Sequence, residues 1–189
     1  MPLKHPHHQN SGTAYHILMT AADIKRILNL QPHPREGGWY TRTYESSELI
    51  APTQFPDARY TGPRHTSTAI YYLLEPDTFS EMHLLQSDEI FHHYLGDPVE
   101  MLQLHPDGHT ETHIISKDLA ANHRPQLTVP RNVWQGSRLL SPDTPNAFAL
   151  LGCTVSPGFD FSDYQAIPRA DLIARWPTEA QRITQLTRD

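Results

Sequence analysis

The segment around Glu89 places a carboxylic acid beside imidazole and phenol groups within an apolar stretch. It reads Asp-Glu-Ile-Phe-His-His-Tyr over residues 88–94. A glutamate that faces inward from a central strand is costly unless it is paired. A buried glutamate near such groups has a perturbed pKa, the property that a general acid or base needs. Glu89 and the preceding His83 are therefore the first candidates for chemistry.

Strand residues two apart face the same side, so Glu89 and His93 share a face unless a bulge shifts the register. His92 would then face the other way. The alternative interpretation of His83 and Glu89 is a surface pair or a core hydrogen bond.

The elements that hold these residues are predicted to be strands. Short apolar runs cover residues 39–44, 68–74, 79–85, 89–95, 99–105, 110–116, 126–129, 133–140, 147–155 and 159–164. Strands of this length and spacing predict an antiparallel sandwich or barrel. His-Pro-Asp-Gly-His at residues 105–109 predicts a hairpin turn, because Pro presets one torsion and Gly accepts a positive φ.

Short helices are predicted near both ends of the chain. Thr20 and Asp23 form a capping pair for the first helix, and Pro32 follows its end. Near the C-terminus, one helix covers residues 171–176 and a second covers residues 178–186. Thr178 and Gln181 form a capping pair for this last helix.

Composition limits the class of protein. The chain has 189 residues, of which 38% are hydrophobic and 19% charged, as expected for a single core. Fifteen Lys and Arg against 21 Asp and Glu give a net charge of −6, which argues against a nucleic-acid partner. The sequence has neither an apolar run of about 20 residues that would span a membrane nor the apolar core of a signal peptide near residue 1. We expect a cytoplasmic protein.

The N-terminal residues differ in composition from the rest. Residues 1–15 are polar, and they include His5, His7 and His8. We predict that residues 1–15 form a disordered arm and that residues 16–189 form one domain. The single cysteine, Cys153, lies in an apolar strand and is expected to be a small core residue.

Several motifs follow one another in a characteristic order. They are Gly-Gly-Trp-Tyr at 37–40, Ser-Asp-Glu-Ile-Phe-His at 87–92, Gly-Asp-Pro at 96–98 and Val-Ser-Pro-Gly-Phe-Asp-Phe at 155–161. The chain thereby resembles the cupin-5 group of the cupin superfamily, also called domain of unknown function 985, over about residues 18–186. The resemblance implies an all-β double-stranded β-helix, an RmlC-like jelly-roll barrel with short flanking helices. It also implies a homodimer with a small-molecule pocket in the barrel mouth.

One local departure from the family pattern precedes the first strand motif. The family's His-Pro-Glu-Gly-Gly segment appears here as His-Pro-Arg-Glu-Gly-Gly over residues 33–38, with Arg35 inserted. The insertion leaves the position of His33 relative to Glu36 open.

The resemblance further implies positions for metal ligands. Metal-dependent cupins place two His, one Glu and a later His inside the barrel. His83 and Glu89 fit two of these positions. Leu85 and Gln135 stand where the other two His residues would be. A Gln amide is a poor donor to Zn or Fe, so His83, Glu89 and Gln135 are weak metal candidates. A pocket without a metal cofactor is favoured over a weakly bound divalent ion.

Other residues have two interpretations each. Trp134 either walls the pocket or fills the core. Arg42 and Arg64 either bind an anionic group of a ligand or form surface ion pairs. The imidazoles that flank the hairpin turn, His105, His109 and His113, are expected to face solvent, and a metal cluster is their alternative interpretation.

The sequence therefore leaves three functions open. The first is a cupin that binds a small polar molecule, with His83, Glu89, His92, His93, Gln135, Trp134, Tyr71 and Arg42 as candidate ligand contacts. The second is an isomerase or epimerase that acts on a sugar nucleotide or similar metabolite. The resemblance to cupin isomerases, which use a His base and a Tyr acid in the barrel pocket, implies these roles here: His83 or His93 as the base and Tyr40, Tyr71 or Tyr94 as the acid. The third is a metal-dependent oxygenase or lyase.

Overall fold

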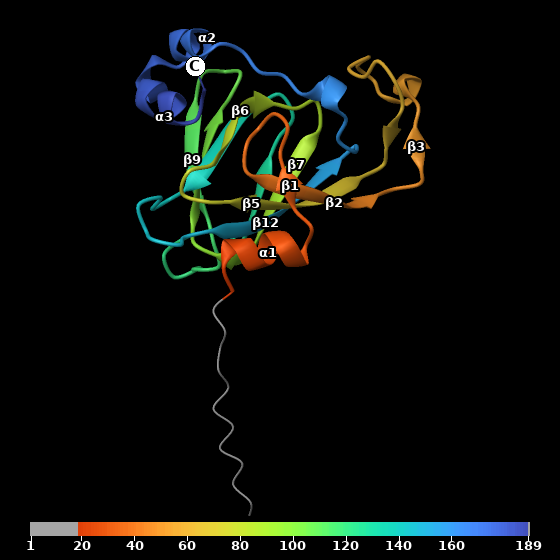
Figure 1. Cartoon of the computed structure of the whole chain (residues 1–189). Helices are drawn as coiled ribbons and strands as arrows, with labels where there is room; N and C mark the ends of the chain where they lie inside the picture. Colours follow the sequence, from red (N-terminus) through yellow and green to blue (C-terminus); the bar gives the residue numbers. More distant parts are fainter. Residues whose placement is uncertain (1–18, 189) are drawn as a thin grey trace, which may run out of the picture.

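The computed structural model describes residues 19–188, and the strands among them form antiparallel sheets (Figure 1). The six-stranded sheet contains, in order, β1 (Gln31–Pro32), β2 (Trp39–Glu45), β5 (Thr68–Leu74), β12 (Ala149–Ser156), β7 (Asp88–Gly96) and β10 (Gln126–Val129). The four-stranded sheet contains β6 (Phe79–Leu84), β11 (Trp134–Leu139), β8 (Val99–Leu104) and β9 (Thr110–Ile115). A separate pair is formed by β3 (Leu49–Ile50) and β4 (Arg64–His65). The predicted antiparallel all-β architecture is confirmed.

The main core lies between the two large sheets. Tyr72 and Leu151 contribute to it from the six-stranded sheet, and Met101, Ile115 and Leu139 from the four-stranded sheet. Each of these side chains is at most 1% exposed. Fully burying one such side chain stabilises the fold by roughly 1.5 to 3 kcal/mol, so this contact holds the sheets face to face.

The helix α1 (Ala21–Ile27) packs on the outer face of the six-stranded sheet (Figure 1). It begins at Thr20, whose side chain accepts a hydrogen bond from the Asp23 N–H while the Asp23 carboxylate accepts one from the Thr20 N–H. The predicted capping pair is therefore confirmed. Ile24 is the buried residue of α1 and contacts the apolar cluster that includes Leu73 and Leu150.

Two further helices, α2 (Arg169–Arg175) and α3 (Ala180–Gln185), cover the outer face of the four-stranded sheet. The prediction that Thr178 caps the last helix is wrong. A 3₁₀ turn, η3 (Pro177–Glu179), comes first, because proline suits the first position of a helical turn. The helix α3 starts after it with Glu179 at its N-cap and no side-chain capping bond.

The strand predicted at residues 159–164 is also wrong. The 3₁₀ turn η2 (Phe161–Asp163) lies here, and the Asp160 side chain accepts the Ser162 N–H at its start. This local hydrogen bond competes with strand pairing. A third 3₁₀ turn, η1 (Pro52–Gln54), follows β3.

Some predictions fall on residues outside the described part of the chain. Residues 1–18 and residue 189 are not described, so the predicted arm at residues 1–15, with His5, His7 and His8, lies there. Within residues 19–188, none of the helices has the length and apolar character that crossing a lipid bilayer requires.

Candidate functional site

A cavity of about 500 Å³ lies on the inner side of the six-stranded sheet. The β1–β2 hairpin, β5, β12, the start of β7 and the segment at residues 159–161 contribute its lining. Its polar groups include His33, Glu36 and Glu89, and its aromatic lining includes Tyr40, Tyr72 and Phe161. This size and this mixture of apolar walls with a few polar groups are typical of a small-molecule pocket.

Glu89 lies near the start of β7 and is 7% exposed. The side-chain amide of Gln135, on β11, donates a hydrogen bond of 2.6 Å to Glu89 Oε2. Burial, followed by the negative charge of Glu36, raises the pKa of Glu89 to about 7. His83 and the Gln135 amide oppose this shift. Near neutral pH the carboxyl group of Glu89 therefore exchanges its proton readily.

Glu36 reaches the cavity because the loop between β1 and β2 is tight. The His33 N–H donates to the Gly38 carbonyl at 3.0 Å, and Gly37 and Gly38 have φ angles of +93° and +66°. A Cβ atom at Gly38 would lie 2.8 Å from the Leu73 carbonyl oxygen. The two glycines thus permit a turn that side chains would block, and this turn holds Glu36 against the barrel.

The Glu36 carboxyl lies between two imidazoles in different tautomers. His33 Nδ1 accepts the Glu36 N–H at 2.9 Å, which leaves the ring proton on Nε2, 3.7 Å from Glu36 Oε1. His83 Nδ1 lies 2.7 Å from the Glu81 carbonyl and donates to it, so His83 Nε2 carries a lone pair. This lone pair is 3.8 Å from the same oxygen, Oε1. Glu36 Oε1 therefore lies near one hydrogen-bond donor and one acceptor.

Burial favours the neutral form of all three groups. It lowers the pKa of His33 and of His83, and it raises the pKa of Glu36. The His83 ring is also stacked on Tyr164, with ring centroids 5.2 Å apart, and is 1% exposed. His33, Glu36 and His83 thus form a buried cluster of groups that hold or accept a proton without a net charge.

Comparison with known proteins identifies the family. The model of the cupin superfamily family DUF985 matches residues 22–167. The chain belongs to this family. The resemblance predicted from the sequence motifs is confirmed, and the two facing sheets are those of a cupin jelly-roll barrel.

Similar proteins extend over most of this cupin. Protein SO0799 of Shewanella oneidensis is 31% identical, with a TM-score of 0.77 over 90% of this chain and 99% of that chain. A hypothetical protein of Leishmania major is 27% identical, with a TM-score of 0.81 over 90% of this chain and 100% of that chain. The uncharacterized protein YML079W of Saccharomyces cerevisiae is 28% identical over 142 residues, which are 72% of this chain and 70% of that protein.

Five of the site residues predicted from the sequence lie in or directly behind the cavity wall. Glu89, Arg42 and Tyr40 line the cavity. His83 and Gln135 face each other across β6 and β11, and each is 1% exposed. Arg42 forms an ion pair with Glu45, which also lines the cavity, so its guanidinium already has a carboxylate partner.

Tyr71 and His92 lie on the outer face of the six-stranded sheet. The Tyr71 ring packs edge-on against Tyr94, with centroids 6.0 Å apart, and His92 is stacked on the same Tyr94 ring. Tyr71 also packs against the cluster that contains Ile24 of α1. Alternation along β5 explains this placement, because the next residue, Tyr72, lines the cavity. The structure does not bring Tyr71, His92 or Tyr94 to the cavity.

Trp134 and His93 also lie away from the cavity lining. Trp134 packs with Leu172 in the apolar cluster beneath α2 and α3 and thus fills a core. His93 lies at a register shift in the β7–β12 pairing, and its Nε2 lies 3.0 Å from the Asp97 carbonyl oxygen. Strand alternation predicted that Glu89 and His93 share a face unless a bulge lies between them, and this irregularity is present beside His93.

Sequence reasoning did not select three residues that line the cavity, namely His33, Glu36 and Tyr72. A signal for the first two was present in the His-Pro-Arg-Glu-Gly-Gly segment, where the family motif recurs with Arg35 inserted. The register of the β1–β2 loop decides the direction of Glu36, and the sequence did not reveal that register.

The residues at the cupin metal positions do not fit a four-ligand centre. Leu85 lines the cavity as an apolar side chain, and the amide of Gln135 donates its N–H to Glu89. Within residues 19–188, the ligand atoms of three His, Cys, Asp or Glu side chains lie within 4.8 Å of one another in one group only, which is outside this cavity. The interior cluster is thus suited to acid–base and hydrogen-bonding chemistry.

Proposed function

We propose that this cupin binds a small, uncharged polar molecule that carries several hydroxyl groups in its barrel cavity. The observation that supports this proposal is that two carboxyl groups with raised pKa, those of Glu36 and Glu89, line a cavity of about 500 Å³. A neutral carboxyl group both donates and accepts a hydrogen bond. Two such groups suit a ligand whose hydroxyls do the same.

The charges around the cavity favour an uncharged ligand. Glu45 and Asp160 line it together with Glu36 and Glu89, and among the described lining residues the guanidinium, Arg42, is paired with Glu45. The carboxylates of Glu45 and Asp160 would oppose an anionic ligand. Sugar nucleotides are therefore less suitable than neutral sugars or polyols.

The walls of the cavity support the same class of ligand. Tyr40 and Phe161 offer aromatic surface, and Ile70 and Val155 offer aliphatic surface. A sugar ring presents apolar C–H faces and polar edges, so it would contact both kinds of lining. His83 Nε2 and Gln135 Oε1 are buried atoms without a hydrogen-bond partner in the described residues. They add two polar atoms of the interior that are stabilised when they receive a hydrogen bond.

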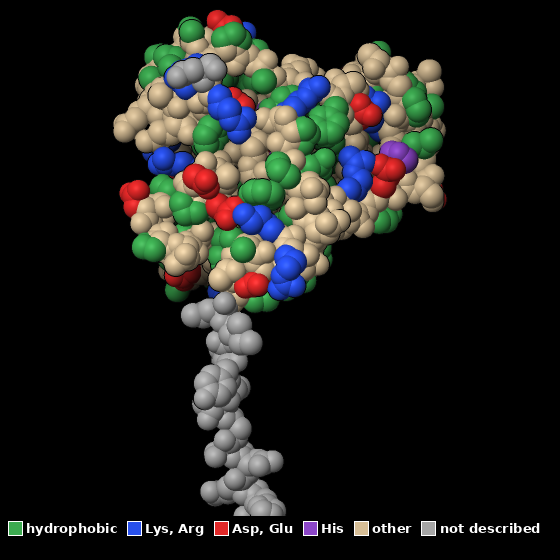
Figure 2. Space-filling model, in the orientation of Figure 1, with side chains coloured by type: hydrophobic (Ala, Val, Ile, Leu, Met, Phe, Trp, Pro, Cys, Tyr) green, Lys and Arg blue, Asp and Glu red, His purple; other side chains and the backbone are tan. Residues whose placement is uncertain are grey.

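Neither nucleic acid nor a membrane is part of this proposal. On the face drawn in Figure 2, Lys and Arg side chains lie among Asp and Glu side chains instead of forming one basic field. The net charge of −6 also repels phosphate backbones.

Thermal-shift measurements test the proposal. The probes are neutral monosaccharides and polyols, with nucleotide sugars as the anionic comparison. A ligand at 100 times its Kd stabilises the fold by about 2.7 kcal/mol, which a melting curve detects. Glu89→Gln and Glu36→Gln should each weaken the shift, whereas Tyr71→Phe on the outer face should retain it. A shift produced only by anionic probes, or one unchanged in both cavity variants, would contradict the proposal.

A second candidate function is an isomerase or epimerase. The observation that favours it is the position of Glu36 Oε1, 3.7 Å from His33 Nε2 and 3.8 Å from His83 Nε2. Beside it, Glu89 has a pKa of about 7. A carboxylate would remove a C–H proton next to a carbonyl, the carbonyl oxygen would take a proton from a neighbouring acid, and the reverse transfers would complete the reaction.

Proton exchange distinguishes an enzyme from a binding protein. A sugar that binds is incubated with the protein in D₂O, and its C–H signals are followed by proton NMR. Loss of one C–H signal in the wild type but not in Glu89→Gln indicates isomerase chemistry. Stable signals in both indicate binding alone. The third function, a metal-dependent oxygenase or lyase, is not supported by the side chains at Leu85 and Gln135.

A further inference from the structure

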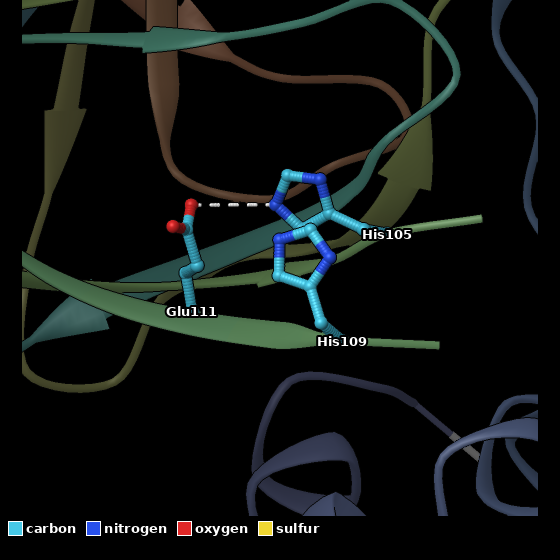
Figure 3. A group of neighbouring side chains, drawn as sticks. All are labelled: His105, His109 and Glu111. Atoms are coloured by element: carbon cyan, nitrogen blue, oxygen red, sulfur yellow. Dashed lines mark ion pairs between the residues drawn. The ribbon is translucent and has the colours of Figure 1, made fainter. Parts of the chain in front are cut away.

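The hairpin between β8 and β9 gathers three metal-ligating side chains outside the cavity (Figure 3). The His105 N–H donates to the His109 carbonyl at 3.0 Å, so these two residues face each other across the turn. Gly108 closes the turn with a φ of +94°. Glu111, in β9, is two residues beyond His109, the residue that precedes this strand. Ligand atoms of His105, His109 and Glu111 all lie within 4.8 Å of one another.

The imidazole of His109 is prepared for a metal ion by Asp107. His109 Nδ1 lies 2.6 Å from Asp107 Oδ1 and donates its proton to this carboxylate. The lone pair is then on Nε2. A carboxylate behind the imidazole is the common arrangement at protein metal sites, because it fixes the tautomer and orients the ring.

His105 supplies the second imidazole. Its Nε2 is buried, has no hydrogen-bond partner among residues 19–188 and lies 3.4 Å from Glu111 Oε2, the pair marked in Figure 3. The expectation that His105 faces solvent is wrong, since its side chain is 15% exposed while that of His109 is 52% exposed. The two rings are stacked, with centroids 3.8 Å apart. An unpaired buried nitrogen therefore lies beside a carboxylate and a second imidazole.

We propose that His105, His109 and Glu111 bind a divalent transition-metal ion of the Zn²⁺ type. Two imidazoles and a carboxylate, with water as a fourth ligand, form an established zinc donor set. Zn–N and Zn–O bonds of about 2.0 to 2.2 Å require the three ligand atoms to close slightly around the ion. The His109 side chain is 52% exposed, so a small shift of its ring, with the Asp107 contact kept, allows this closure. His113, whose Nε2 lies 3.2 Å from Glu111 Oε2, positions the carboxylate.

Calorimetric titration with Zn²⁺ alone tests the proposal on the full chain. His5, His7 and His8 are first replaced by Ala, because imidazoles near the N-terminus would bind Zn²⁺ as well. In this background we expect one Zn²⁺ per chain. His109→Ala and Glu111→Gln should each weaken binding at least about tenfold, since each removes one of three ligands. Co²⁺ should give the visible absorption of a four-coordinate site in the background protein alone.

Three control measurements distinguish the loss of the metal site from other effects of the substitutions. Asp107 itself would not contact the metal ion. Asp107→Asn should nevertheless weaken Zn²⁺ binding about 10- to 100-fold, because it replaces the carboxylate that orients the His109 ring. Glu89→Gln and His92→Ala alter the cavity and the outer sheet face, so binding should be unchanged in both. Melting curves of the hairpin variants check that the fold is intact. Zn²⁺ binding that persists in His109→Ala and Glu111→Gln, or that is absent from the background protein, would overturn the proposal.

Discussion

The imidazole Nε2 of His83 lies 3.8 Å from Glu36 Oε1 and has no hydrogen-bond partner in the described part of the chain. This contact lies between β6 of the four-stranded sheet and the β1–β2 loop of the six-stranded sheet. It also links the two acidic groups of the interior, because the charges of both Glu36 and His83 influence Glu89. The protonation state of the cavity therefore depends on Glu36, His83 and Glu89, whose titrations are coupled.

The first prediction concerns the coupling between the two glutamates. Glu36→Gln should lower the apparent pKa of Glu89, because the negative charge of ionised Glu36 is, after burial, the second cause of its elevation. Carbon-13 NMR of the glutamate carboxyl groups measures this value. Glu45→Gln, at an exposed carboxylate paired with Arg42, is the matched control and should have a smaller effect. An unchanged titration of Glu89 in the Glu36 variant would show that the coupling is absent.

The second prediction is a pH dependence of stability. Glu89 keeps its proton up to about pH 7 in the folded protein, while an unperturbed glutamate loses it near 4.5. The folded state thus binds more protons in this window, and the contribution of Glu89 to stability is full below about pH 4.5 and is lost as the pH rises to about 7. We expect the loss to be roughly 2 to 3 kcal/mol.

Urea unfolding of the wild type and Glu89→Gln at several pH values measures this dependence. The variant keeps a neutral side chain, so its stability relative to the wild type should increase between pH 5 and pH 8. Burial lowers the pKa of His33 and His83, so these residues act with the opposite sign and reduce stability as the pH falls below about 6.5. To a first approximation their effect cancels in the comparison. Parallel stability curves would rule out a raised pKa at Glu89.

The third prediction concerns a buried ion pair between β4 and η2. Arg64 Nε and Nη2 donate to Asp163 at 2.7 and 2.6 Å, and both side chains are 5% exposed. The sequence suggested an anion-binding group or a surface pair, and the structure shows neither. Asp163→Asn should lower the free energy of unfolding by about 3 to 5 kcal/mol, because it leaves a buried guanidinium without its carboxylate.

A surface pair provides the control for that measurement. Arg42→Met removes an ion pair whose side chains are 37% and 42% exposed, and its cost should stay below about 1 kcal/mol. Chemical denaturation of both variants gives the two values. Equal costs would mean that burial does not determine the contribution of Arg64.

The fourth prediction compares two threonines at helix starts. Thr20→Ala removes the capping hydrogen bond to Asp23 and should cost about 1 kcal/mol. Thr178→Ala is the matched control, since Thr178 lies in η3 and caps neither η3 nor α3. Its unfolding free energy should change by less than about 0.5 kcal/mol. A larger loss at Thr178 than at Thr20 would contradict the assigned caps.

The fifth prediction is the homodimer implied by the family. Met19, Ile27, Tyr94 and Leu95 are exposed apolar side chains, and all four lie around one surface groove beside α1. We propose that a second copy of the chain covers this surface. Light scattering after size-exclusion chromatography should show a dimer for the wild type and a monomer for Leu95→Asp. A wild type that elutes as a monomer would remove the proposal.

The strands and the first helix could be predicted from the sequence because their signals are local. The short apolar run at 68–74, the turn at 105–109 and the cap at Thr20 each depend on neighbours a few residues away. The prediction failed at residues 159–164, where a short-range hydrogen bond from Asp160 replaced strand pairing. It failed at Thr178 because Pro177 started a 3₁₀ turn before the helix.

The sequence by itself determined the family and the all-β architecture, because strand length and spacing and the order of the motifs are properties of the linear chain. It favoured an inward-facing Glu89 and left a surface pair open, and the structure shows Glu89 only 7% exposed. Only the tertiary structure decided the partners of Glu89. Glu36, His83 and Gln135 come from three separate elements, and their meeting depends on how the sheets face each other. A bulge in the β7–β12 pairing, and the side of β5 that Tyr71 occupies, are likewise set by strand pairing between distant segments, which local patterns do not encode.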